Sequence, residues 1–367
     1  MAAPVAQLDL EPPQRYQGRC PAFRQPTEIM SFSLDDNRDM HFDDRALNCY
    51  YPADMGTDLT KRYETFKARD MSINEHLDHL LAGLVHARQT NLQQLPSRPD
   101  FVTFRGIMTR IMYLPYNTRE DWELGATRFN GTVYLEDHLT PARLRQQQDM
   151  NHHHRLLSYS GYRFETVSTV PVEPDQIRGP NDPILRERHD QDTNNMAEFN
   201  CIFQTKLGNH SIIMGAEVDC VSHGRHKEGR VGRYMELKTS AVINNDRQRH
   251  NFEANKLLKF YIQSFLAGIP KVVVGFRDHN NRLRELCYLK TLEIPRMVRQ
   301  QQLWDPTVCL RFADQFLTWL GQVITEDDPN TSYTIKFQSS TRSVQVVYEG
   351  HQGGFLPSEF VQTFRSW

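Results

Sequence analysis

Four charged side chains occur at two-residue steps in two short segments of the sequence: Glu217 and Asp219, then Glu236 and Lys238. Successive side chains of a β-strand point to opposite faces of a sheet, so residues two apart share one face. If residues 211–220 pair with residues 233–240 through the loop between them, the four charged groups can lie side by side. Taken alone, such a pattern is more typical of a solvated sheet face, where each salt bridge contributes little.

The combined order of an Asp, a hairpin-length gap and Glu-x-Lys predicts metal-dependent cleavage of phosphate esters. This reaction requires charge to be neutralised on the phosphoryl oxygens and a water to be made nucleophilic. Hard divalent cations such as Mg²⁺ and Mn²⁺ do both, and they prefer carboxylate oxygens as ligands. Three carboxylates can hold one or two such ions. Lys238 can then hold the attacking water or stabilise the developing charge.

Three further residues fit the same chemistry, although each has a simpler interpretation by itself. Glu165 closes the segment GYRFE and, alone, is an ordinary solvated glutamate. Gln263 shares one face of a predicted helix with Lys256 and Lys259, a pattern that is also typical of a solvated helix face. Arg105 lies among apolar neighbours in FVTFRG. A buried arginine needs an anionic partner, and either an internal carboxylate or a phosphate would serve.

The elements that must position these residues alternate between strands and helices. Strands are predicted at residues 198–207, 211–220, 232–241 and 271–278, helices at 74–89, 158–170, 251–268 and 306–324, and hairpins at 122–137 and 332–349. In residues 211–220 the even positions are apolar and are expected to face the core. This mixture predicts an α/β fold in one domain, with a mixed central sheet flanked by helices. The expected boundaries are a loose segment at 1–28, a catalytic domain at 29–348 and a tail at 349–367.

Composition limits the classes of partner. The chain has 367 residues, 39% hydrophobic and 24% charged, with a net charge of −2. A chain so balanced binds a polyanion through a local basic patch or a metal rather than through its overall charge. Its six cysteines form no C-x-x-C pair, and His152–His154 reads as a solvated loop or helix start rather than a metal site. We expect no disulfide-linked partner and no membrane span.

Several motifs occur together, in the order FVTFRG, GYRFE, GAEVDC, ELKTS and KFYIQSFLAGIPKVVVGFRD. Together with LNCYYP they resemble the DXO/Rai family of eukaryotic RNA 5′-end decapping and quality-control enzymes, from about residue 27 to about residue 348. The resemblance implies a single domain of two β-sheets with flanking helices, related to D-(D/E)-x-K nucleases. Within that family, the sequence resembles a fungal Rai-type member.

The resemblance also implies roles for the matching residues. The expected metal ligands are Glu165, Glu217, Asp219, Glu236 and the backbone carbonyl of Leu237. The four acids are expected to act in catalysis with Lys238 and Gln263, which match the residues around the nucleophile. Arg105, Lys238 and Gln263 are expected to contact the substrate, and Arg105 matches an arginine that contacts its phosphate. The expected cofactor is one or two ions of Mg²⁺ or Mn²⁺.

The implied activity is removal of pyrophosphate from 5′-triphosphate RNA, and removal of incomplete or NAD-type caps. The implied partner, besides RNA 5′ ends, is a nuclear 5′–3′ exoribonuclease of the Rat/Xrn type, and the implied location is the nucleus, with the cytoplasm as the alternative. A second interpretation is a DXO-like enzyme with its own 5′–3′ exoribonuclease activity and no such partner. A non-catalytic scaffold would not need the complete acid and lysine set, and a DNA nuclease would not explain GYRFE or the Gln263 helix.

Overall fold

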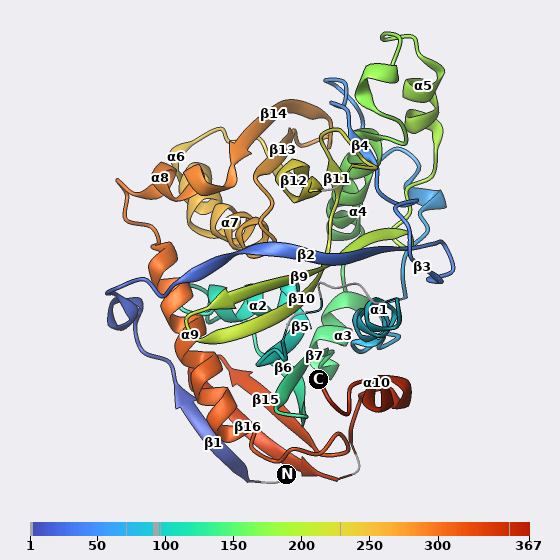
Figure 1. Cartoon of the computed structure of the whole chain (residues 1–367). Coiled ribbons are helices and arrows are strands. Elements are labelled where there is room, and N and C mark those ends of the chain that lie inside the picture. The colour runs from blue at the N-terminus through green and yellow to red at the C-terminus, as the bar shows by residue number, and fades with distance from the viewer. Residues whose placement is uncertain (1–2, 71, 91–94, 96, 228, 352) are drawn as a thin grey trace.

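Two mixed β-sheets form the framework of the protein (Figure 1). In the computed structural model, the described residues are 3–70, 72–90, 95, 97–227, 229–351 and 353–367. The ten-stranded sheet has the order β1-β16-β15-β6-β7-β5-β10-β9-β2-β3, and the six-stranded sheet has the order β14-β13-β12-β11-β4-β8. Both sheets contain parallel and antiparallel neighbours, as in the pairs β10–β5 and β10–β9. The predicted fold class is therefore confirmed.

The ten-stranded sheet contains β1 (Pro4–Asp9), β2 (Phe23–Leu34), β3 (Met40–His41), β5 (Phe101–Phe104), β6 (Trp122–Phe129), β7 (Thr132–His138), β9 (Glu198–Leu207), β10 (His210–Glu217), β15 (Ser332–Gln338) and β16 (Ser343–Gly350). The six-stranded sheet contains β4 (Cys49–Tyr50), β8 (Thr169–Val170), β11 (Cys220–Val221), β12 (Tyr234–Ala241), β13 (Lys271–Arg277) and β14 (Leu283–Lys290). The helices are α1 (Asp78–Gln89), α2 (Arg105–Tyr113), α3 (Pro141–Gln148), α4 (His152–Val167), α5 (Pro183–Asp190), α6 (Asp246–Asn251), α7 (Leu257–Leu266), α8 (Ile294–Val298), α9 (Pro306–Val323) and α10 (Ser358–Thr363).

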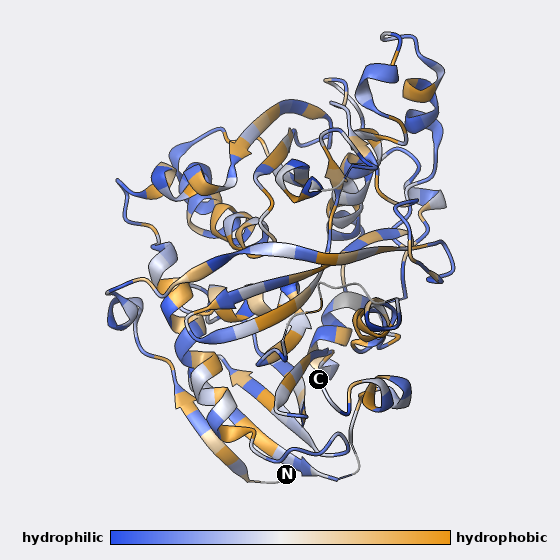
Figure 2. Cartoon of the chain, viewed as in Figure 1, coloured by the Kyte–Doolittle hydropathy of each residue, from blue (hydrophilic) through white to orange (hydrophobic). Residues whose placement is uncertain are grey.

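Helices cover the faces of both sheets. The largest core cluster joins α2, α7 and α9 to apolar side chains of both sheets, among them Met214 of β10 and Val274 of β13. On the opposite face of the ten-stranded sheet, α1 and α10 pack against residues such as Ile213. On the opposite face of the six-stranded sheet, α4 packs Phe164 against Leu237 and Val273. Figure 2 shows hydrophobic residues along the interior strands, whereas the segment around α5 is mostly hydrophilic.

β10 is buried on both faces, which its sequence pattern only half predicted. Ile212 and Met214 face one core cluster, as the even positions were expected to do. Ile213 on the opposite face is also fully buried. A strand covered on both sides reads as a continuous apolar run rather than as an alternation. Only Glu217, at the end of the strand, is exposed on the face that was expected to carry charge.

The two ends of the chain are more ordered than the sequence predicted. Residues 1–28 were expected to be loose, but residues 4–9 form β1, which pairs with β16, and β2 begins at Phe23. The expected tail at 349–367 contains α10, whose Phe360 packs on α1. The Pro- and Gln-rich composition of residues 1–28 does not reveal their strands, because the order of these strands comes from contacts with distant parts of the chain.

Two helices begin or end at residues other than those predicted from the sequence. The helix expected at 158–170 is α4, which begins at His152 and ends at Val167. His152–His154 form its first turn, and the Asn151 side chain caps it by accepting a hydrogen bond from the His154 backbone N–H at 2.9 Å. The helix expected at 251–268 begins earlier, as α6, and passes through a π-helical turn at Phe252–Lys256 before α7. The helix predicted at 306–324 is confirmed as α9, Pro306–Val323.

Candidate metal and phosphate site

The acidic residues lie where the chain passes from one sheet to the other. Glu217 is the last residue of β10 and pairs with Asn200 in the ten-stranded sheet. Cys220, three residues later, begins β11 and pairs with Met235 of β12 in the six-stranded sheet. Asp219 therefore lies in the link between the sheets. The expected pairing of 211–220 with 233–240 is limited to β11, because β10 belongs to the other sheet.

Glu236 is the buried centre of the site. Its side chain is fully shielded from solvent, and its Oε2 accepts a hydrogen bond from Arg105 Nη1 at 2.8 Å. Lys238 Nζ lies 2.6 Å from Glu236 Oε1, on the same face of β12, as predicted from the two-residue step. Burial alone would raise the pKa of Glu236, but Arg105 and Lys238 outweigh it and lower the pKa to about 2. Glu236 is therefore ionised at neutral pH.

The other carboxyl groups are harder to ionise. Burial raises the pKa of Asp219 to about 6, although Lys238, with Nζ 3.8 Å from Oδ2, opposes the shift. Burial, then Glu198 and Asp219, raises the pKa of Glu217 to about 8, even though this side chain opens onto a cavity. The pKa of Glu165 on α4 is raised by burial and by the charges of Asp219 and Glu217.

These shifts show that, with all four carboxyl groups ionised, the site would carry more negative charge than its own cations balance. The four carboxyl groups face two cations, Arg105 and Lys238. The difference corresponds to one divalent cation. Oxygen-only ligands suit a hard ion such as Mg²⁺ or Mn²⁺ better than a soft one. The charge and the donor set of the site therefore fit such an ion.

The side chains are nevertheless not arranged as a finished ligand shell. Within the described part of the chain, no three His, Cys, Asp or Glu side chains are grouped so that they could hold an ion as they stand. Two contacts account for this: Glu236 is turned toward its two cations, and Asp219 Oδ2 accepts a 2.6 Å hydrogen bond from the Leu237 backbone N–H. Binding an ion would require these carboxylates to exchange such contacts for the metal. The role expected for the Leu237 carbonyl stays a prediction.

Arg105 and Gln263 lie at the border of the acidic cluster. The sequence left open whether Arg105 pairs with an internal carboxylate or a phosphate, and the structure shows the carboxylate of Glu236. Both Arg105 and Gln263 line a cavity of about 440 Å³ that also contains Glu217. Further N–H groups of Arg105 can therefore face a ligand there. The structure brings all of the predicted site residues into one region.

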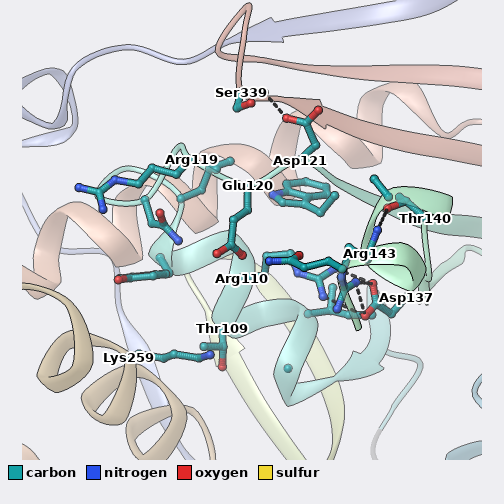
Figure 3. Close-up of a pocket in the computed structure, with 18 of the residues that line it drawn as sticks. Thr109, Arg110, Arg119, Glu120, Asp121, Asp137, Thr140, Arg143, Lys259 and Ser339 are labelled. Carbon is teal, nitrogen blue, oxygen red and sulfur yellow. Dashed lines mark hydrogen bonds and ion pairs between the residues drawn. The ribbon is translucent and has the colours of Figure 1, made fainter. Parts of the chain in front are cut away.

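A second and larger cavity, of about 1020 Å³, adjoins the first (Figure 3). The two share five lining residues: Phe104, Gly106, Asp137, Arg143 and Gln263. Figure 3 shows Arg110 and Arg143 directed at Asp137, and Lys259 beside Thr109. Arg110 binds Asp137 through two hydrogen bonds of 2.6 and 2.8 Å. The cavity beside the acidic cluster thus adjoins a larger one, whose lining includes four cations and three acids.

Sequence reasoning missed the charged wall of the smaller cavity. Arg38 donates two hydrogen bonds to Glu75, at 2.7 and 3.0 Å, and lies 3.0 Å from Glu198. Arg69 lies 2.7 Å from Glu75 and 3.7 Å from Glu198. Glu198 could have been suspected, because it begins the apolar strand that pairs with β10. Arg38 and Arg69 come from irregular segments, where no periodicity indicates which way a side chain points.

Comparisons with known proteins agree with this site. A family model described as RAI1 like PD-(D/E)XK nuclease matches residues 24–361. The chain is 33% identical over 366 residues to Decapping nuclease RAI1 of Neurospora crassa, covering 97% of this chain and 87% of that one. It is 34% identical over 363 residues to the Decapping and exoribonuclease protein of Xenopus laevis, covering 95% and 88%.

A solved structure gives the same relationship. The crystal structure of Candida albicans Rai1 in complex with pU5-Mn²⁺ superposes with a TM-score of 0.85 at 26% identity, over 98% of this chain and 99% of that chain. A family match and a relative of this similarity cover nearly the whole sequence, including every residue of the acidic cluster. The chain belongs to the RAI1-like PD-(D/E)XK nuclease family.

Proposed function

We propose that the protein is a divalent-metal-dependent hydrolase that acts on RNA 5′ ends. Its reactions would be removal of pyrophosphate from 5′-triphosphate RNA and removal of incomplete or NAD-type caps. The observation that carries the proposal is the cluster of four carboxyl groups around two cations, beside the smaller of two adjoining cavities. Family membership and the pU5-Mn²⁺ complex of the Candida albicans relative support the choice of substrate and ion.

The acidic residues would bind the metal ion, and the basic residue beside them would bind the attacking water. Glu165, Glu217, Asp219 and Glu236, with the Leu237 carbonyl, would hold one or two ions of Mg²⁺ or Mn²⁺. When bound, such an ion neutralises phosphoryl oxygens and makes a water nucleophilic. Lys238, between Asp219 and Glu236, would hold the attacking water.

Two residues at the border would hold the substrate. Arg105 and Gln263 face the cavity that contains Glu217. They would orient the phosphate that reacts, since donors fixed in a partly buried site need little reorganisation during the reaction. Attack of water at the first phosphorus would release pyrophosphate and leave RNA with a 5′-monophosphate.

The test uses 5′-triphosphate RNA labelled near its 3′ end, incubated with Mg²⁺ or Mn²⁺. Released pyrophosphate and RNA length are measured together. We expect pyrophosphate and full-length RNA. Glu217→Ala with Asp219→Ala should abolish the reaction in a folded protein, while Glu285→Ala, which removes an exposed acid from β14, should leave it unchanged. Full activity without the two cluster acids would overturn their assigned role.

A second candidate is a decapping enzyme with its own 5′–3′ exoribonuclease activity. It is favoured by the name of the Xenopus laevis relative, Decapping and exoribonuclease protein. The same assay separates the two functions, because an exonuclease shortens the labelled RNA progressively. Shortening that depends on Glu217 and Asp219 would show that one site performs both reactions.

We further propose a nuclear location and a nuclear 5′–3′ exoribonuclease of the Rat/Xrn type as partner. A 5′-monophosphate end is the product of the proposed reaction and the substrate of such a nuclease, so the two activities would follow one another. Pull-down of that nuclease by the Glu217→Ala, Asp219→Ala protein tests binding apart from catalysis. Fluorescence microscopy of the tagged chain tests the location. No helix in the described ranges has both the length and the apolar character for crossing a bilayer.

A further inference from the structure

Lys256, Lys259 and Arg277, which lie beside the site, have no carboxylate partner within the described residues. Most arginines that line the cavities differ, because Arg38, Arg69, Arg105, Arg110 and Arg143 each form an ion pair with Asp or Glu. Arg119, at the far side of the larger cavity from Lys259, is the exception among the arginines that the structure describes there. In the described part of the chain, the one polar partner of the Lys256 ammonium is the Ser240 hydroxyl, at 3.2 Å. Arg277 Nε is buried, and no described residue forms a hydrogen bond with it.

The cations continue from the acidic cluster in one direction. Gln263, Lys259 and Lys256 lie on one side of the helix, at spacings of four and three residues. Ser240, which binds Lys256, is two residues beyond Lys238 on the same face of β12. Seven residues of helix span roughly 10 Å, so one phosphate at Gln263 would not also reach Lys256.

The cations of this row repel one another. Arg277 helps burial to lower the pKa of Lys256. Lys238 and Arg110 do the same to Lys259, although Glu120 partly compensates. Placing like charges close together in partly desolvated positions costs stability unless an anion binds between them. The arrangement therefore indicates a site for an anion that is not part of the protein.

The backbone around Lys256 is held firmly. Lys256 ends the π-helical turn 252–256, and such turns are frequent at functional sites. Trp304 Nε1 donates a 2.8 Å hydrogen bond to the Glu253 carbonyl, and Gln301 Nε2 donates one of 3.0 Å to the Glu253 carboxylate. The acid within the turn is thus engaged by a neutral amide, and the lysine is presented to the solvent side.

We propose that Lys259, Lys256 and Arg277 form a track for the backbone phosphates of single-stranded RNA, on the 3′ side of the reacting 5′ end. The inference rests on the proposed function, because that function puts an RNA 5′ end at Gln263 and Arg105. An RNA strand carries one negative charge per nucleotide, and a row of unpaired cations complements such a repeating charge. Phosphate contacts of this kind position a strand without reading its sequence.

The test compares binding of short and long RNA by fluorescence anisotropy in Mg²⁺. The probes are 3′-labelled RNAs of two and of ten nucleotides, each with a 5′-triphosphate in which methylene replaces the oxygen between the first and second phosphorus. The variant is Lys256→Ala with Lys259→Ala, two exposed positions. The matched control is Lys271→Ala with Lys290→Ala, which removes two exposed lysines from the other end of β13 and its neighbour β14.

We expect the track variant to bind the longer RNA about a hundredfold more weakly, about tenfold for each lysine. The dependence of log K on log salt should become shallower by about 1.4, or about 0.7 for each lost contact with a single strand. Binding of the dinucleotide, and all binding by the control, should stay at the wild-type level.

Two results would overturn the track. If the variant lost the same affinity for both RNAs, the lysines would hold the terminal phosphates of the 5′ end. If its affinity for the longer RNA were unchanged, the lysines would bind no phosphate. Failure of the proposed function would give another result. The wild type would then bind the long probe through the lysines, but it would release no pyrophosphate from unmodified triphosphate RNA.

Discussion

At the scale of single residues, the charge of Glu236 depends on cations from two different elements. Arg105 begins α2, and Lys238 follows Glu236 on β12. The Arg105 side chain is 10% exposed and that of Glu236 is 0% exposed, so neither group has much water to replace a lost partner. Removing one member of such a pair leaves a buried charge uncompensated, which costs more than the pair itself gains.

Arg105→Ala should therefore lower the free energy of unfolding by about 3 kcal/mol. Urea denaturation with EDTA present measures this. Adding Glu236→Gln should recover part of the loss, because it removes the unpaired charge. Arg110→Ala is the control: its partner Asp137 is 41% exposed, and loss of such a pair should cost at most about 1 kcal/mol. Equal losses for the two arginines would show that Glu236 is not the cause.

The raised pKa values of Asp219 and Glu217 predict the pH dependence of stability without metal. A carboxyl group whose folded pKa exceeds its unfolded value binds its proton more tightly when folded. Its contribution to stability is therefore lost as pH rises through the folded values, about 6 for Asp219 and about 8 for Glu217. We expect the Tm in EDTA to fall across this range, and Glu217→Gln with Asp219→Asn to make the fall shallower.

Added Mg²⁺ or Mn²⁺ should reverse this trend. An ion competes with protons for the same carboxyl groups, so it should raise the Tm more at about pH 8 than at about pH 5. Differential scanning fluorimetry at the two pH values measures the shift. A metal-induced rise that is equal at both values, or that persists in the Glu217→Gln, Asp219→Asn protein, would place the ion elsewhere.

At the scale of elements, close packing of α4 on the six-stranded sheet fixes the position of Glu165. Phe164, its neighbour, packs on Gly275 of β13, where an added Cβ would lie 2.6 Å from Phe164 Cε2 and 2.8 Å from Cζ. The ring is fully buried and has little room to move. The glycine therefore lets α4 come close enough for Glu165 to join the other acids.

Gly275→Ala should push α4 away, lowering the free energy of unfolding by about 1–3 kcal/mol and reducing pyrophosphate release. Gly321→Ala provides the control, since it lies within α9 and an added Cβ would have no atom nearer than 3.9 Å. In a helix this change should stabilise by about 0.5–1 kcal/mol and leave activity unchanged. Wild-type activity of the Gly275→Ala protein would contradict the positioning role.

Strands and helices whose apolar residues recur with a clear period were predictable from the sequence. The connections between these elements, and the sheet to which each strand belongs, were not. The strand at 198–207 and the helix α9 lie where their apolar patterns placed them. The residues of the acidic cluster were found because two-residue steps and the family resemblance both indicated them. The sequence did not reveal that β10 ends at Glu217 and that the chain then changes sheet. Val218 in the link and Cys220 in β11 continue the apolar alternation of β10.

At the scale of the whole molecule, the site joins the two sheets. Glu217 belongs to the ten-stranded sheet, Glu236 and Lys238 belong to the six-stranded sheet, and Asp219 lies in the link. Groups from both sheets would have to bind one ion or one pair of ions together. A bound metal should therefore stabilise the junction rather than either sheet alone.

Amide hydrogen exchange followed by mass spectrometry tests this coupling. With Mg²⁺ or Mn²⁺, peptides covering residues 216–221 and 234–239 should both exchange more slowly, because their opening would break the metal site. The hairpin at residues 332–350, on the far part of the ten-stranded sheet, should not change. Protection of only one of the first two peptides would mean that the ion is held by one sheet.

The pairing of β1 with β16 has a consequence for how the protein folds as it is synthesised. Asp9 is opposite Ser343 in this pair, so β1 leaves the ribosome long before its partner strand exists. At about 5–20 residues per second, β1 would wait roughly 20–70 s. During that time an unpaired strand edge is open to other chains. β1 is made well before its partner strand and is thus among the last of the described strands to be protected, so a chaperone that binds the nascent β1 segment would have its greatest effect in that interval.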